Sequence, residues 1–79
     1  MSDALNDEIT RRLAERFPGA DIEVTLEGNR ALIAIAHSEF TELSRVKRQQ
    51  AVYGVIGGYV TDGTLHAVTI QASVPDQRG

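Results

Sequence analysis

A regular alternation of apolar and polar residues constrains the fold of this chain more than any other feature. Three apolar residues alternate with three polar ones: Ile22, Val24, Leu26 and Glu23, Thr25, Glu27. This period of two predicts a strand with one buried face. A turn sequence follows at 27–30, and then the short apolar run 31–36. The two segments together predict an antiparallel hairpin.

An amphipathic helix is predicted before this hairpin. Apolar residues recur every four positions: Leu5, Ile9, Leu13 and Phe17. Asp7 and Glu8 lie near its start, where the helix dipole favours anions. Pro18 and Gly19 predict its end, because a proline pushes the preceding residue out of the α region.

A second helix is predicted from about 44 to 60, after a connector at 37–42. One face is expected to carry the following residues: Val46, Gln50, Tyr53, Ile56 and Val60, with Val52 and Tyr59 at its border. Gly54, Gly57 and Gly58 each weaken a helix interior. They predict a kink, close packing, or two helices placed end to end. Gly54 and Gly57 also match the GxxG spacing of loops that clamp a nucleic-acid backbone, and close helix packing is the alternative.

The last strand is predicted from 65 to 74, after a turn at 61–64. Its apolar face is expected to contain four residues: His66, Val68, Ile70 and Ala72. The order α-β-β-α-β makes the second and third strands parallel neighbours with a right-handed crossover. Helices then cover one face of a three-stranded sheet, an α+β arrangement.

The length and composition indicate one small domain over residues 1–79, with a frayed polar tail at 75–79. The chain contains no cysteine, which excludes disulfides, a cysteine nucleophile and a thiolate metal site of its own. The first eight residues are acidic and lack the apolar stretch of a secretory signal. No apolar run approaches the roughly 20 residues that span a bilayer. We therefore expect a cytoplasmic protein without a membrane partner.

The formal net charge of -3 is unevenly distributed along the chain. The basic residues Arg45, Lys47 and Arg48 cluster at the start of the second predicted helix. They form either a solvated helix face or a contact surface for DNA phosphate or an acidic partner. The acidic total makes non-specific DNA binding the weaker interpretation.

The two histidines are the candidate metal ligands. His66 is expected at the rim of the sheet, where a neutral imidazole can bind iron. The alternative is a partly buried histidine that hydrogen-bonds a backbone carbonyl. His37 is expected in an exposed loop, and it becomes a second ligand only if that loop folds toward His66. No catalytic triad, paired carboxylates or phosphate-binding glycine loop is present, so we do not expect an enzyme.

Two ordered blocks of the sequence resemble the BolA family. Phe40 is followed by SRVKRQQAVYG at 44–54 and by LHAVTIQASVP at 65–75. The first block is closer to the IbaG/YrbA branch than to BolA itself. The similarity covers most of the chain and is strongest from 40 to 75. It implies a fold like a class II KH domain with a mixed three-stranded sheet.

The resemblance also implies a set of linked roles. BolA-like proteins pair with monothiol glutaredoxins, and the pair can share a [2Fe-2S] cluster to which the BolA partner contributes a histidine. His66 corresponds to that histidine. Some members are described as DNA-binding transcription regulators linked to stress and cell shape. A third interpretation is a structural adaptor that exists as a monomer or as a homodimer formed through a sheet edge.

Three positions depart from the family pattern. Arg30 stands where many members carry a second histidine or a cysteine in the loop between the first two strands, and a guanidinium is not an ordinary metal ligand. Glu42 replaces a family glycine, and the tail 76–79 lacks the usual tryptophan. The first departure bears on cluster binding, and the other two bear on the partner surface.

Overall fold

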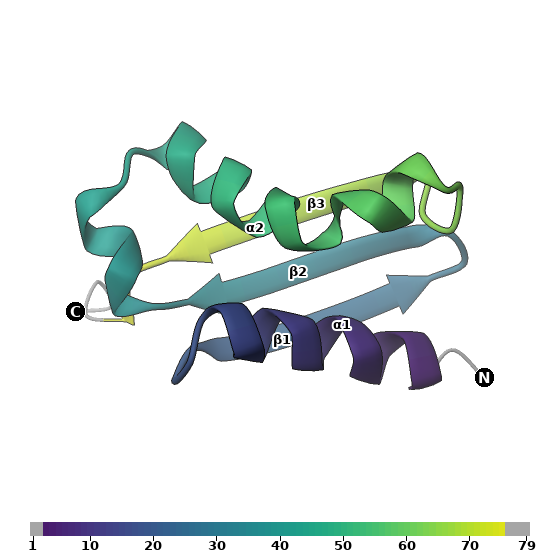
Figure 1. The fold of residues 1–79 in the computed structure, drawn as a ribbon, viewed down its shortest axis with the longest axis horizontal. Coiled ribbons are helices and arrows are strands. Elements are labelled where there is room, and N and C mark those ends of the chain that lie inside the picture. Colours follow the sequence, from purple (N-terminus) through teal and green to yellow (C-terminus); the bar gives the residue numbers. More distant parts are fainter. Residues whose placement is uncertain (1–2, 76–79) are drawn as a thin grey trace.

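The computed structural model describes residues 3–75, in which two helices pack on one face of a three-stranded sheet (Figure 1). The elements follow in the order α1 (Asp3–Arg16), β1 (Asp21–Glu27), β2 (Arg30–Ala36), the 3-10 helix η1 (Ser38–Glu42), α2 (Arg45–Thr61) and β3 (Ala67–Ser73). The predicted order of helices and strands is confirmed, and η1 occupies the predicted connector. Of the expected tail, all but Pro75 lies outside the described residues. No helix within 3–75 is long and apolar enough to cross a membrane.

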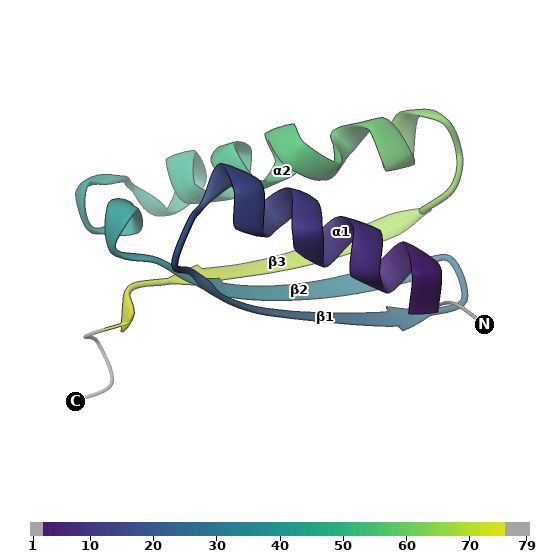
Figure 2. The ribbon, with the colours of Figure 1, turned by 60° about the horizontal axis from the view of Figure 1, so that its bottom comes forward.

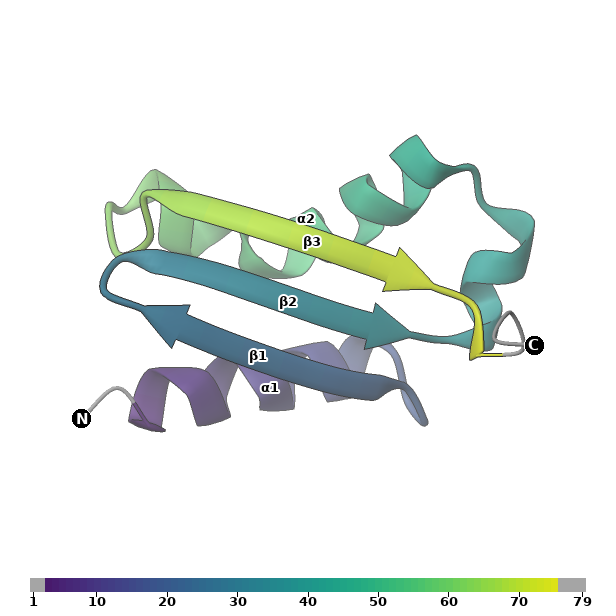
Figure 3. The same ribbon diagram turned by 180° about the vertical axis from the view of Figure 1, so that it is seen from behind.

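The sheet is mixed, with the strand order β1-β2-β3. The hairpin β1–β2 is antiparallel, with Glu27 opposite Arg30 beside its turn. Strands β2 and β3 are parallel, and their register runs from Arg30 opposite Ala67 to Ala36 opposite Ser73. Figure 2 shows that both helices lie on the same side, and Figure 3 shows the sheet from its uncovered side. The α+β class with helices on one face is therefore confirmed.

The core lies between the helices and the covered sheet face. Residue burial alternates along all three strands, as a sheet with one solvated face requires. Ile9 and Leu13 of α1, and Phe17 directly after the helix, have fully buried side chains. Ile33 and Ile35 of β2 lie beneath them and beneath Val52 and Ile56 of α2. The apolar residues whose four-residue spacing predicted α1 are thus the ones that face the core.

Helix α2 differs from the sequence prediction in its buried face, and its glycines follow the close-packing alternative. Val46 and Tyr53 were grouped on one face with Ile56, but they are 63% and 44% exposed, whereas Ile56 and the border residue Val52 are fully buried. The helix is not divided at its glycines, because α2 is a single element of 17 residues. Close packing occurs at Gly57, where an added Cβ would lie 3.0 Å from a ring carbon of Tyr53.

The start of β3 also differs from the prediction. The strand begins at Ala67 rather than at Leu65, and its residues Val68, Ile70 and Ala72 face the helices as expected. His66 does not belong to this apolar face, since it is exposed in the bend before the strand. Leu65, which the same predicted alternation would place on the opposite face from His66, is buried. Its backbone N–H donates to the Tyr59 carbonyl at 3.0 Å, and its side chain belongs to the core cluster that includes Val52 and Ile56 of α2.

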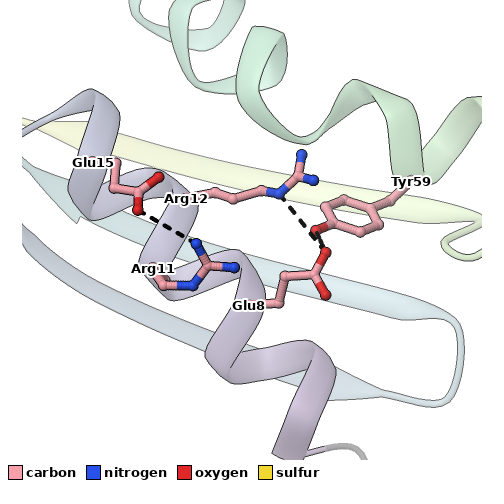
Figure 4. Close-up of polar contacts among 5 residues, drawn as sticks. All are labelled: Glu8, Arg11, Arg12, Glu15 and Tyr59. Carbon is pink, nitrogen blue, oxygen red and sulfur yellow. Dashed lines mark hydrogen bonds and ion pairs between the residues drawn. The ribbon is translucent and has the colours of Figure 1, made fainter.

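A polar cluster joins the two helices on their outer side (Figure 4). The Tyr59 hydroxyl of α2 donates to the Glu8 carboxylate of α1. Arg12 lies 3.7 Å from the same carboxylate oxygen, and its guanidinium carbon is 5.4 Å from the centre of the Tyr59 ring. Burial, and then the hydrogen bond to Glu8, raise the pKa of Tyr59 above its usual 10.0.

This cluster predicts a loss of stability at high pH. The folded protein keeps the Tyr59 proton at a pH where the unfolded chain releases it, so the free energy of unfolding falls as pH rises above 10. We expect Tyr59→Phe to remove that part of the slope between pH 9 and 11.5 in urea unfolding followed by circular dichroism. Tyr53→Phe leaves the contact intact and should keep the wild-type slope. Equal slopes for wild type and Tyr59→Phe would exclude this hydroxyl as the titrating group.

Candidate metal-ligand and partner site

Two loops meet at one end of the sheet, where the β1–β2 turn lies beside the connection from α2 to β3 (Figure 1). Gly28 and Gly63 have positive φ angles of 60° and 86°, a conformation that glycine adopts without strain. Asp62 accepts a hydrogen bond from the backbone N–H of Thr64 at 2.9 Å. That bond lowers the pKa of the Asp62 carboxyl, so the ionised side chain fixes the second loop.

His66 is exposed at the junction of these loops. Its backbone N–H donates to the Asn29 carbonyl at 2.7 Å, which fixes the main chain against the β1–β2 turn. Its imidazole makes no hydrogen bond to any residue that the structure describes. Arg30 pairs with Ala67 in the parallel register and is exposed beside it. An accessible imidazole therefore stands on a fixed backbone, with a guanidinium on the neighbouring strand.

His37 occupies a different environment, because its side chain is only 14% exposed. Its Nδ1 accepts a hydrogen bond from the backbone N–H of Glu39 at 3.1 Å and caps η1. Its Nε2 lies 2.9 Å from the Pro18 carbonyl, so the neutral ring donates there. The ring also packs edge-on against Phe17 and Phe40. Both ring nitrogens therefore have structural partners.

The structure does not bring the two histidines together. His37 follows the end of β2 and His66 precedes the start of β3, which is parallel to β2. The six residue steps between the first and last paired positions correspond to about 20 Å. The loop of His37 thus does not fold toward His66. Among residues 3–75, no group of three or more His, Cys, Asp or Glu side chains is arranged to hold a metal ion.

The basic residues lie at the other end of α2 from His66. Arg45 and Lys47 are exposed, but the Arg48 Nε donates to the Leu43 carbonyl at 3.0 Å. The 17 residues of α2 separate this cluster from the His66 loop by about 25 Å. The two predicted contact sites therefore do not form one continuous patch. The GxxG pair, Gly54 and Gly57, lies inside α2 rather than in a loop.

Two side-chain amides that the sequence did not single out hold the outer strands. Asn6 of α1 donates to the Val24 carbonyl of β1 at 2.7 Å, and Gln49 of α2 donates to the Ile70 carbonyl of β3 at 2.8 Å. Each helix thus caps one backbone acceptor of the strand beside it. An isolated polar residue on a helix gives no sequence signal of such a contact, since the acceptor is a backbone atom.

Comparisons with known proteins agree with this architecture. The family model described as BolA-like protein matches residues 25–77. An acid stress protein of Escherichia coli strain K12, IbaG, is 34% identical over 70 residues, which are 89% of this chain and 83% of that protein. An uncharacterized protein from the rpoN-murA intergenic region of Acinetobacter guillouiae is 32% identical over 72 residues, which are 91% and 87% of the two chains.

Solved structures share the fold at lower sequence identity. BolA1 from Arabidopsis thaliana superposes with a TM-score of 0.81 at 17% identity, over 94% of this chain and 95% of that one. The BolA domain of SufE1 from the same plant gives a TM-score of 0.82 at 22% identity, over 91% and 93%. The arrangement of two helices on a mixed sheet is therefore common to these chains.

Proposed function

Because the chain belongs to the BolA family, we propose that it binds a monothiol glutaredoxin and supplies His66 as a ligand to a [2Fe-2S] cluster shared between the two proteins. The observation that supports this proposal is the exposed imidazole of His66 on a backbone fixed to Asn29. Because the main chain at His66 is already fixed, ligand binding orders little additional backbone.

The metal ligands that this chain can offer fit a cluster shared with a second protein, and they are too few for a cluster bound by this chain alone. The chain contains no cysteine, and His66 is the single imidazole at this end of the described structure. Iron–sulfur clusters are held by thiolates, with histidine replacing cysteine at some irons. The glutaredoxin side must therefore contribute the thiolates. The bound cluster would serve one-electron chemistry or transfer to another protein, and this chain would orient one nitrogen ligand.

The nearby residues support a defined orientation of the partner. The Asp62–Thr64 contact and the two positive-φ glycines shape the loops on either side of His66. Arg30 adds one positive charge at the same rim. A glutaredoxin that presents a carboxylate beside its cluster would meet that charge.

The test is to mix the chain with cluster-loaded monothiol glutaredoxin and record visible absorption and circular dichroism. We expect a new spectrum with wild type and none with His66→Ala. His37→Asn is the matched histidine control, because asparagine still caps η1 and His66 is untouched; it should reproduce the wild-type spectrum. No change with wild type, or the same change with His66→Ala, would reject the ligand role.

DNA binding through the start of α2 stays a prediction with weaker support. Arg48 is engaged with the Leu43 carbonyl, which leaves Arg45 and Lys47 exposed. Arg48 keeps its charge, but three cations on a chain of net charge -3 give little of the salt-dependent affinity that phosphate contacts produce.

A further inference from the structure

We infer that the outer edge of β3 is an interaction surface for a second copy of this chain, which adds its own β3 in antiparallel orientation. In the described structure β3 is an edge strand with β2 on one side only. Backbone groups alternate between the two sides of a strand. The Ser73 carbonyl points toward β2, where it accepts from His37, and the Ile70 carbonyl points outward to Gln49. Val68, Ile70 and Ala72 therefore present backbone groups to the free edge.

The charge distribution favours β3 over the other edge. Strand β3 reads AVTIQAS and contains no charged residue, no proline and no glycine. Strand β1 carries three carboxylates, those of Asp21, Glu23 and Glu27. Charged residues are a common protection of edge strands against pairing. Two copies that each carry a net charge of -3 repel one another, so their contact requires a border without charge, and β3 provides one.

The side chains next to this edge extend the apolar surface. Gln49, Gln50, Tyr53 and Gly54 of α2 line a groove with Val68 and Ile70 of β3. Tyr53 is 44% exposed, and Val46, seven residues earlier on the same helix face, is 63% exposed. Gly54 has no atom within 4 Å of an added Cβ, so the groove is open there.

If a two-fold axis beside Ile70 relates the β3 strands of the two copies, every cross-strand residue pair consists of uncharged residues. Ile70 then lies opposite Ile70 of the second copy, Val68 opposite Ala72, and Thr69 opposite Gln71. Thr69 and Gln71 are exposed on the uncovered sheet face, so changes at these positions leave the core intact. The side-chain amide of Gln49 already donates to the Ile70 carbonyl, which lies at the centre of the proposed contact. A second copy must replace this hydrogen bond with one of its own. Gln49 therefore limits the association.

The test is sedimentation velocity over a concentration series, with far-UV circular dichroism to verify folding. Thr69→Lys with Gln71→Lys places like charges opposite each other twice, and we expect about tenfold weaker dimerisation. Thr69→Lys with Gln71→Glu places opposite charges there and should restore or strengthen the dimer. Gln49→Ala frees the Ile70 carbonyl and should strengthen dimerisation several-fold.

The matched control is Thr25→Lys with Glu23→Gln, which adds the same two units of charge on the exposed face of β1. We expect it to raise association slightly through the lower net charge, opposite to the double-lysine variant of β3. A chain that stays monomeric at every concentration, with and without Gln49→Ala, overturns the proposal. Equal dimerisation of the two β3 charge variants also overturns it. His66→Ala should not change dimerisation, so this result is independent of cluster binding.

Discussion

Phe40→Ala is expected to lower the free energy of unfolding by about 3–5 kcal/mol, as large aromatic truncations in cores do. Phe40 belongs to η1 and is fully buried. Its ring packs edge-on against Phe17 at 5.3 Å and against His37 at 6.0 Å, and such pairs add to the effect of burial. A domain of this size has a total stability of about 4–12 kcal/mol. The variant should therefore unfold at a much lower urea concentration than wild type, because it loses a large share of that total.

The measurement is urea unfolding followed by far-UV circular dichroism. Phe40→Leu retains most of the side-chain volume and should cost about 1–1.5 kcal/mol, because volume-conserving substitutions in a core are tolerated best. The difference between the two variants isolates the volume of the ring. A cost for Phe40→Ala below about 1 kcal/mol would mean that η1 does not contribute this side chain to the core.

If the proposed cluster forms between this chain and a glutaredoxin, Arg30→His is expected to prolong its lifetime. Arg30 is paired with Ala67, the residue after His66, so its side chain starts from the strand next to the proposed ligand. An imidazole at this position can bind iron, whereas the guanidinium cannot. We expect the rate of cluster loss to a chelator to fall by at least about tenfold, since even an outer-shell partner of a ligand changes metal affinity 10–100-fold.

The control for Arg30→His is Arg30→Gln, which removes the same charge without adding a good iron ligand. Decay of the visible absorption after addition of a chelator gives both rates in complexes with cluster-loaded glutaredoxin. Equal rates for Arg30→His and Arg30→Gln would show that a ligand at residue 30 does not reach the cluster. Slower decay in both variants would assign the effect to the lost positive charge.

The fold was largely predictable because its signals are local. The period of two in β1 and the four-residue spacing in α1 each arise from one buried face of one element. Helix α2 was harder, because Val46 and Tyr53 are apolar residues that the sheet leaves exposed. The stripe that α2 buries depends on how the helix docks on the sheet, which is a property of the whole fold.

The sequence indicated which residue type forms the candidate site, a histidine, but it indicated only part of the contacts around that residue. The position of His66 at the rim agrees with the structure, but its place outside β3 depends on the Asn29 carbonyl, a backbone atom that any residue carries. The structural contacts of His37 depend on the Pro18 carbonyl, 19 residues earlier in the sequence. Every residue has a backbone carbonyl, so the amino-acid sequence does not indicate which carbonyl will accept such a hydrogen bond.

The hydrogen bond between the His66 N–H and the Asn29 carbonyl joins two points that are 37 positions apart in the chain. The hairpin can form from nearby residues, whereas β3 must wait for the whole crossover through α2. A nascent or partly denatured chain therefore has no ordered rim on which to offer its imidazole. A partner that binds at this end would therefore bind fully folded chains in preference to incompletely folded ones.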